Sequence, residues 1–203
     1  MHRGEHWDEV YRRRPTEELS WFQAEPTPSL DLIGATGVGH DARILDVGGG
    51  TSLLVDRLLD LGFRRPGVLD ISGVALELAR RRLADRSDAV TWLEADVLEY
   101  DPEEPWDVWH DRAVFHFLVD PIDRARYRAS LLRSVRRGGH ALVATFGPEG
   151  PVSCSGLATV RCSAEDLARE LGSRFRLVES RTEHHRTPSG VVQQFVYARL
   201  ERS

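Results

Sequence analysis

The sequence predicts an α/β fold: a doubly wound, mostly parallel sheet of seven strands with helices on both faces, preceded by an N-terminal helical lid. Three observations predict it. Short apolar runs alternate with stretches of helical period between Ala42 and Gly147, which is typical of parallel sheets covered by crossover helices. Three consecutive glycines follow the first apolar run directly. After Gly147, two alternating segments are separated by the turn residues RTPSG, which indicates an antiparallel C-terminal strand pair at the sheet edge.

The expected elements follow in chain order. Strands are expected at 42–48, 66–72, 90–97, 106–111, 140–147, 175–185 and 191–200. Helices are expected at 52–62, 72–85, 123–139 and 163–172. Ser72 is a plausible N-cap of the second helix, and Ser163 with Asp166 forms a capping-box pattern before the last. The glycines at 138 and 139 are expected to close the third helix.

A chain of 203 residues with 41% hydrophobic residues is large enough for one well-buried core. We therefore expect a single domain over residues 1–203. Within it, residues 1–34 form the predicted lid, 40–147 the core that carries the glycines, and 148–203 a substrate-side insert followed by the C-terminal strands.

The charge balance argues against several partners and reactions. The formal net charge is −5, and the 27 basic residues are all arginines spread along the chain. Nucleic acid is therefore a poor candidate partner, and no lysine is available for a Schiff base or a Walker-type phosphate contact. No stretch approaches the ~18 apolar residues that span a bilayer, and the start of the chain lacks the apolar core of a signal peptide. We expect a cytoplasmic protein with no nucleic-acid or membrane partner.

The cysteines and neighbouring histidines do not form a metal-ligand pattern. Cys154 and Cys162 are too few for a disulfide framework. A site that adds His184 and His185 lacks paired-ligand spacing. We expect no metal, and two free thiols that serve mainly as small packing residues.

The three glycines lie where a doubly wound sheet approaches its ligand, directly after the first strand. A dinucleotide fingerprint requires a further glycine at position 53, which is Leu53. This departure disfavours a nicotinamide cofactor and favours one without a pyrophosphate. Such a cofactor needs acidic partners for its amine and hydroxyl groups, and Asp46, Asp70 and Asp96 lie at or near three successive strand ends.

Five blocks in this order resemble the class I S-adenosylmethionine-dependent methyltransferases over about residues 40–147. They are LDVGGGTS, VLDIS, EADV, WDVWHDRAVFHFL and VRRGGHALVATF. The resemblance implies S-adenosylmethionine as cofactor and S-adenosylhomocysteine as product. It implies that the glycine loop flanks the methionine part, that Asp70 binds the ribose, that Asp96 and Val97 contact the adenine, and that Asp111 and the residues after it line the methyl-transfer site. Ser52 stands where many members have another glycine. The candidate cofactor-binding residues are Asp46, Gly48, Gly49, Gly50, Ser52, Asp70, Ile71, Asp96, Val97 and Asp111.

Candidate catalytic residues are His116 and His110, since either could take a proton from a substrate. Each is more readily explained as a hydrogen-bonded structural residue than as a catalytic one. The N-terminal segment resembles the W-x-x-x-Y…W-[FY] leader of thiopurine-type small-molecule methyltransferases and of elongation-factor-type lysine methyltransferases. Its aromatics either pack on the sheet or close over the site. The candidate lid and substrate residues are Trp7, Tyr11, Trp21, Phe22, Cys154 and Arg186.

The function expected from these residues is methyl transfer to a sulfur, oxygen or nitrogen nucleophile of a small polar molecule. A protein methyltransferase acting on lysine is the alternative, since the leader does not separate the two. From another class, the chain could be a cofactor-binding module without catalysis. Only turnover distinguishes this last alternative from an enzyme.

Overall fold

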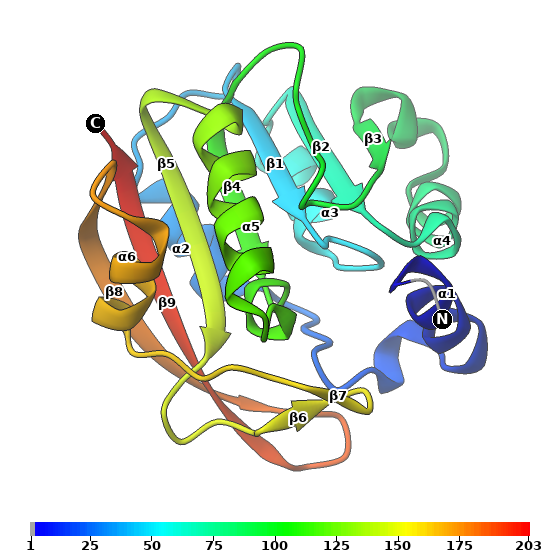
Figure 1. Ribbon diagram of the computed structural model, residues 1–203. Coiled ribbons are helices and arrows are strands. Elements are labelled where there is room, and N and C mark those ends of the chain that lie inside the picture. The colour runs from blue at the N-terminus through cyan, green and yellow to red at the C-terminus, as the bar shows by residue number, and fades with distance from the viewer. Residues whose placement is uncertain (1–2) are drawn as a thin grey trace.

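The computed structural model describes residues 3–203 and confirms the predicted α/β fold (Figure 1). The sheet has seven strands in the order β3-β2-β1-β4-β5-β9-β8. Their bounds are β1 Arg43–Val47, β2 Arg65–Asp70, β3 Thr91–Glu94, β4 Trp106–Arg112, β5 Val135–Phe146, β8 Phe175–Arg186 and β9 Val192–Arg202. The first five strands are parallel, and β9 joins β5 antiparallel, followed by β8. The predicted edge pair is therefore confirmed.

Helices cover both faces of this sheet. These helices are α2 Thr27–Gly34, α3 Leu54–Asp60, α4 Gly73–Leu83, α5 Pro121–Ser134 and α6 Ala164–Leu171, whereas α1 Arg3–Arg13 packs against α4. One face packs against α5 and α6 in a core that contains Trp109, Tyr127 and Leu167. The other face packs against α2, α3 and α4, through clusters that include Ile44 and Val68. The remaining short elements are the 3₁₀ turns Thr16–Glu18, Ala84–Ala89 and Phe115–Phe117 and the small hairpin of β6 Ser153–Cys154 and β7 Leu157–Ala158.

Two predicted helix N-caps are confirmed, and the predicted C-terminal end of one helix is wrong. Ser72 accepts a hydrogen bond from the Ala75 amide, and the capping box at Ser163 is formed. The helix expected at 123–139 instead runs over Pro121–Ser134, because Asp120 caps it with Pro121 in the first turn. The two glycines lie inside β5, where a side chain on Gly139 would come within 2.8 Å of the Asp107 carbonyl. They permit a strand irregularity and do not end the helix.

The strand order places a topological switch between β1 and β4. From β1 the chain adds β2 and β3 on one side, and from β4 it adds β5 on the other. Ligands of open α/β sheets bind at the carboxyl ends of the strands beside such a switch. Within residues 3–203, no helix has the length and apolar character needed to cross a membrane.

Candidate functional site

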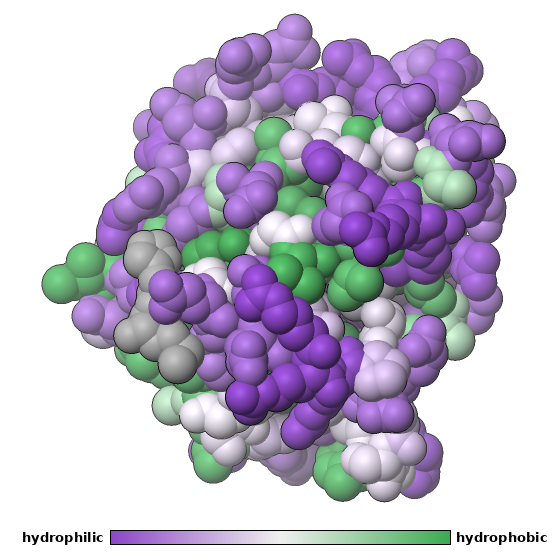
Figure 2. All heavy atoms as spheres, turned by 90° about the vertical axis from the view of Figure 1, so that its right-hand side faces the viewer, coloured by the Kyte–Doolittle hydropathy of each residue, from purple (hydrophilic) through white to green (hydrophobic). Residues whose placement is uncertain are grey.

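A cavity of about 460 Å³ lies at the carboxyl ends of β1, β2 and β4. It is bounded by α1, the loop after β4 and the β6–β7 hairpin. On the face that carries α1 and α4, apolar side chains gather in a hollow surrounded by hydrophilic residues (Figure 2). This volume is in the range of small-molecule sites, so the cavity is the candidate active site.

The glycine loop forms one wall because side chains would not fit there. Gly48 lines the cavity with a φ of +64°, and a Cβ on it would overlap the Val114 side chain. Gly50 has a φ of +47°, and a Cβ on it would overlap the Tyr11 hydroxyl and lie 3.2 Å from an Asp70 oxygen. A Cβ on Gly49 would lie 2.7 Å from a carboxylate oxygen of Asp46. The loop therefore brings bare backbone against the lid and the cavity.

Asp70, at the end of β2, lines the cavity together with Ile71. Its Oδ1 accepts a hydrogen bond of 2.8 Å from the Ser72 amide. Burial raises the pKa of Asp70 to about 7, although the Ser72 bond acts in the opposite direction. An acidic group of this kind at the second strand end has the position that the predicted ribose contact requires.

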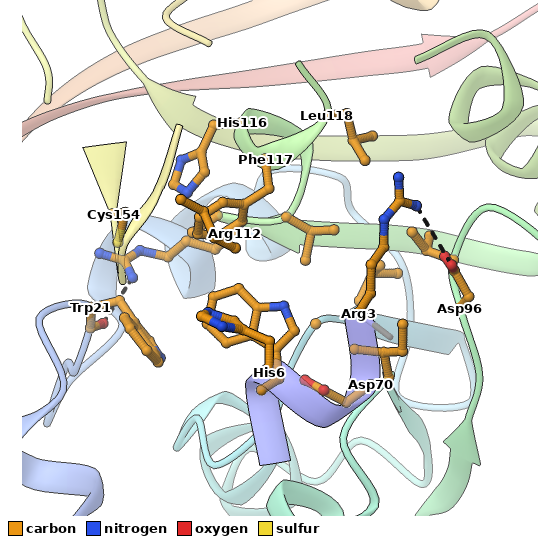
Figure 3. Close-up of a pocket in the computed structure, with 18 of the residues that line it drawn as sticks. Arg3, His6, Trp21, Asp70, Asp96, Arg112, His116, Phe117, Leu118 and Cys154 are labelled. Atoms are coloured by element: carbon orange, nitrogen blue, oxygen red, sulfur yellow. Dashed lines mark hydrogen bonds and ion pairs between the residues drawn. The ribbon is translucent and has the colours of Figure 1, made fainter. Parts of the chain in front are cut away.

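Asp96 and Val97 line the next part of the cavity. Asp96 Oδ1 accepts a bond of 2.9 Å from the Leu98 amide, and its Oδ2 lies 3.6 Å from Arg3 Nη1. Figure 3 shows this ion pair at the end of the cavity opposite Arg112. Arg3 thereby ties α1 to the predicted adenine side, and it also pairs with Asp123.

Asp46 and His110 do not line this cavity, contrary to the prediction for both. They are register partners on β1 and β4, and their side chains lie on the α2 face of the sheet. His110 Nδ1 lies 2.7 Å from Asp46 Oδ1, and its Nε2 lies 2.8 Å from Ser29 Oγ. Because all three residues are buried and His110 bonds to both of the others, they form a structural network beneath the glycine loop.

Asp111 also lies outside the cavity, which corrects its expected place at the methyl-transfer site. It is fully buried toward α5, where it accepts bonds from the amides of Val114 and Phe115 and from the Tyr127 hydroxyl. Burial raises the pKa of Asp111 to about 6. The carboxylate holds the turn after β4 and thereby positions the residues that do line the cavity.

His116 lies in that turn and its ring lines the cavity. The ring is fully buried and stacks on Phe146 with centroids 4.3 Å apart. Both ring nitrogens lack a hydrogen-bond partner within residues 3–203. Burial, and then the charge of Arg112, lower the pKa of His116 to about 3. The imidazole is therefore neutral at pH 7 and is a hydrogen-bonding group more than a base.

Three of the four predicted lid aromatics line the cavity, namely Trp7, Tyr11 and Trp21. Trp7 contacts Trp21 and Phe117 edge to face, at centroid distances of 5.9 and 5.0 Å. Phe22 instead borders a separate cavity of about 40 Å³ under the glycine loop, together with Gly49 and Ser52.

The two predicted substrate residues behave differently. Cys154 lies half-buried at the cavity, on β6. Arg186 is exposed and donates a hydrogen bond to the Gly190 carbonyl in its own hairpin, away from the cavity.

Arg112 was not named as a candidate site residue, although it belongs to the segment after Asp111 that was expected to line the methyl-transfer site. It ends β4 and lines the cavity beside Trp21 and Cys154 (Figure 3). Phe146 and Phe195 were also missed, because they come from the ends of β5 and β9 and carry no local motif. The one signal for Arg112 was its place at a strand end beside the predicted loop.

Comparison with known proteins agrees with this geometry. Residues 44–139 match the model of the methyltransferase domain family. A trans-aconitate 2-methyltransferase of Rhizobium etli is 34% identical over 109 residues, which cover 50% of this chain and 39% of that protein. A malonyl-[acyl-carrier protein] O-methyltransferase of Ilyobacter polytropus is 32% identical over 109 residues, covering 52% and 38%. The chain thus spans about two fifths of the length of these curated relatives.

Solved structures share the fold across the whole chain. A structure from work on the conversion of a disulfide bond into a thioacetal in echinomycin biosynthesis has a TM-score of 0.79 and 20% identity, covering 100% of this chain and 92% of the other. The N-methyltransferase NodS from Bradyrhizobium japonicum, in complex with S-adenosylhomocysteine, has a TM-score of 0.73 and 16% identity, covering 96% and 97%. At these identities the similarity shows the fold.

Proposed function

We propose that the chain is a class I S-adenosylmethionine-dependent methyltransferase that transfers a methyl group from S-adenosylmethionine to a small molecule. Its residues 44–139 match the methyltransferase domain family, and it shares its fold with an N-methyltransferase in complex with S-adenosylhomocysteine. The observation that carries this proposal is the cavity itself, which joins the glycine loop and two strand-end carboxylates to an aromatic lid. The curated relative named for trans-aconitate supports a small-molecule acceptor.

The residues at the cavity fit this cofactor. The backbone at Gly48 leaves room for the methionine part, Asp70 would hold the ribose hydroxyls, and Asp96 with Val97 would contact the adenine. When bound, the cofactor supplies a methyl group on a positively charged sulfur that is its own leaving group. The chain's tasks are then to align the acceptor and to exclude water, and Trp7 and Trp21 cover the cavity in the position needed to do so.

The charges at the cavity favour a small molecule over a lysine side chain. Among the described lining residues, the carboxylates are Asp70 and Asp96, both at the predicted cofactor side. The acceptor side holds the cation Arg112, which disfavours an ammonium group beside it. A lysine methyltransferase would be better served by an acidic approach to the acceptor side.

Calorimetric titration with S-adenosylmethionine, S-adenosylhomocysteine and NADH tests the cofactor. We expect micromolar binding of the first two, no binding of NADH, and loss of binding in Asp70→Ala. Failure of both to bind would refute the proposal. If the cofactor binds and no acceptor among thiols, phenols, amines and carboxylates is methylated, the chain is a binding module instead.

A further inference from the structure

The acceptor side of the cavity is apolar with a small polar region. Its walls include Phe117, Phe146, Phe195 and Leu157. Figure 3 shows the His116 ring pointing into the space near Arg112, at the opposite end from Arg3 and Asp96. An acceptor must therefore combine an apolar body with a polar group placed at this point.

The His116 ring marks where the polar group of the acceptor would bind, because both ring nitrogens are free, within the described chain, to form a hydrogen bond with it. It is fully buried, yet neither nitrogen has a partner in the described chain. A buried polar group without a hydrogen-bond partner is destabilising, so a ligand that supplies the partner is favoured. A neutral imidazole keeps one N–H, which can donate to an oxygen of a ligand.

Arg112 supplies the charge. Its guanidinium is fixed by bonds of 2.8 Å from Nε to the Tyr197 hydroxyl and 2.9 Å from Nη1 to the Trp21 carbonyl. It lies over the Phe195 ring, 4.5 Å from the centroid. Nη2 has no hydrogen-bond partner in the described chain, and Glu183 lies 3.8 Å from it.

Arg112 places a positive charge near the His116 ring. The charge that lowers the pKa of His116, after burial, is that of Arg112. Glu183 partly offsets Arg112 at their contact, and it also accepts a bond from the Tyr197 hydroxyl. Glu183 is not among the causes of the lowered pKa of His116. A buried site with this charge favours an anion beside the ring.

We propose that the acceptor is a small molecule with a single carboxylate on an apolar body, and that this carboxylate binds beside His116 and Arg112 and is itself methylated. The inference rests on the methyl transfer proposed above. One cation on the acceptor side suits one negative charge, because Arg3, the other lining arginine, is paired with Asp96 and Asp123. A tricarboxylate such as trans-aconitate would leave further charges against aromatic walls.

The reaction balances without a base. A carboxylate oxygen forms a bond to the methyl carbon while the carbon–sulfur bond breaks, and the electron pair of that bond stays on sulfur. The anion and the sulfonium are both neutralised, and no proton leaves. This matches a cavity in which His116 stays neutral at pH 7, whereas an alcohol or an ammonium group would have to lose a proton.

Binding is measured first, on the full chain saturated with S-adenosylhomocysteine. Calorimetry uses trans-cinnamate, phenylacetate and octanoate, each beside its amide, and trans-aconitate. We expect at least one monocarboxylate to bind more than tenfold tighter than its amide and than trans-aconitate. Arg112→Gln and His116→Phe should each weaken that binding at least tenfold with unchanged affinity for S-adenosylhomocysteine, whereas Arg186→Gln is the matched control. His116→Phe keeps an aromatic ring stacked on Phe146, so it still tests the proposal if Arg112→Gln fails to fold.

Transfer is then measured with methyl-labelled S-adenosylmethionine. A methyl ester releases its label as methanol in mild base, whereas methyl groups on nitrogen, sulfur or an ether oxygen do not. Base-labile label from the bound monocarboxylate supports the inference. Equal binding of acid and amide, or base-stable label from amines, thiols or phenols, overturns it. Failure of S-adenosylhomocysteine itself to bind would instead refute the proposed function.

Discussion

Asp8 Oδ1 accepts a hydrogen bond of 2.7 Å from the Ser72 hydroxyl. This bond joins α1 to the start of α4, because the same hydroxyl accepts the Ala75 amide bond that caps α4. Ser72 also donates its amide to Asp70. The docking of the N-terminal helix is thereby connected to the strand end at which the ribose contact is predicted.

Replacing Asp8 should loosen α1. Asp8→Ala removes the Ser72 contact, which is worth ~1 kcal/mol. We expect faster amide exchange over residues 3–13, little change over residues 73–83, and weaker S-adenosylmethionine binding, since Trp7 and Tyr11 lose their fixed place over the cavity. Mass-spectrometric hydrogen exchange measures the first two effects. Glu9→Ala is the control, because Glu9 pairs along the helix surface with Arg13. Equal exchange in both variants would exclude a latching role for Asp8.

Alanine substitutions at Gly50 and Gly37 should distinguish a steric clash from backbone strain, because both glycines have a positive φ but Gly37 has open space around it. Gly50→Ala places a methyl group against the Tyr11 hydroxyl at a positive φ, so we expect loss of cofactor affinity and of α1 docking. Gly37→Ala is the matched control, since Gly37 has a φ of +72° with open space around it. It should cost ~1 kcal/mol of stability and leave binding unchanged. Calorimetry and thermal unfolding on both variants measure the difference, and equal binding losses would contradict the steric account.

Adding Tyr11→Phe to Gly50→Ala tests the contact directly. Removing the hydroxyl relieves the nearest overlap but leaves the positive φ and the Asp70 oxygen 3.2 Å from the new methyl group. Partial recovery of binding is therefore expected. No recovery at all would mean that the positive φ, together with the remaining contacts to the aromatic ring and the Asp70 oxygen, is enough to prevent the substitution.

Local signals in the sequence predicted most of the fold and the cofactor side of the site. The glycine loop, the acidic end of β2 and the caps at Ser72 and Ser163 each depend on a few adjacent residues. Local sequence signals did not reveal to which face of the sheet a strand residue points. His110 and Asp111 are neighbours on β4, and they point to opposite helix layers. A parallel strand buried on both faces lacks the polar alternation that would reveal direction.

The acceptor side was hard to predict because it is assembled from distant segments. Trp21, Arg112 and Phe195 meet only after β9 has returned beside β5. Arg186 offered an accessible cation in the sequence, but the β8–β9 hairpin carries it into solvent. Pairing of this kind depends on register and not on local composition.

The stability of the unliganded protein should depend on pH through Asp70. Burial raises the pKa of Asp70 from 3.8 to about 7, so between these values the folded chain holds a proton that the unfolded chain has released. This contribution to stability is present below pH 4 and is lost as the pH rises through 7. Asp70→Asn removes the penalty, so its stability relative to the parent chain should rise by ~2–3 kcal/mol between pH 5 and pH 8, because part of the penalty has already developed at pH 5. Thermal unfolding at both pH values measures it. A pH-independent difference would contradict the raised pKa.

His110 should prove structural and not catalytic. His110→Leu leaves Asp46 buried without its 2.7 Å partner and removes the contact to Ser29. Leaving a buried hydrogen-bonding group without its partner costs ~1–3 kcal/mol, so the melting temperature should fall. Activity per folded molecule at low temperature should change only a few-fold, because the ring lies across the sheet from Asp111 and outside the cavity. The double variant Asp46→Asn with His110→Leu should recover part of the stability, since the buried charge is gone. Loss of turnover without loss of stability would return His110 to the catalytic candidates, and it would place the proton-accepting step on the α2 face of the sheet.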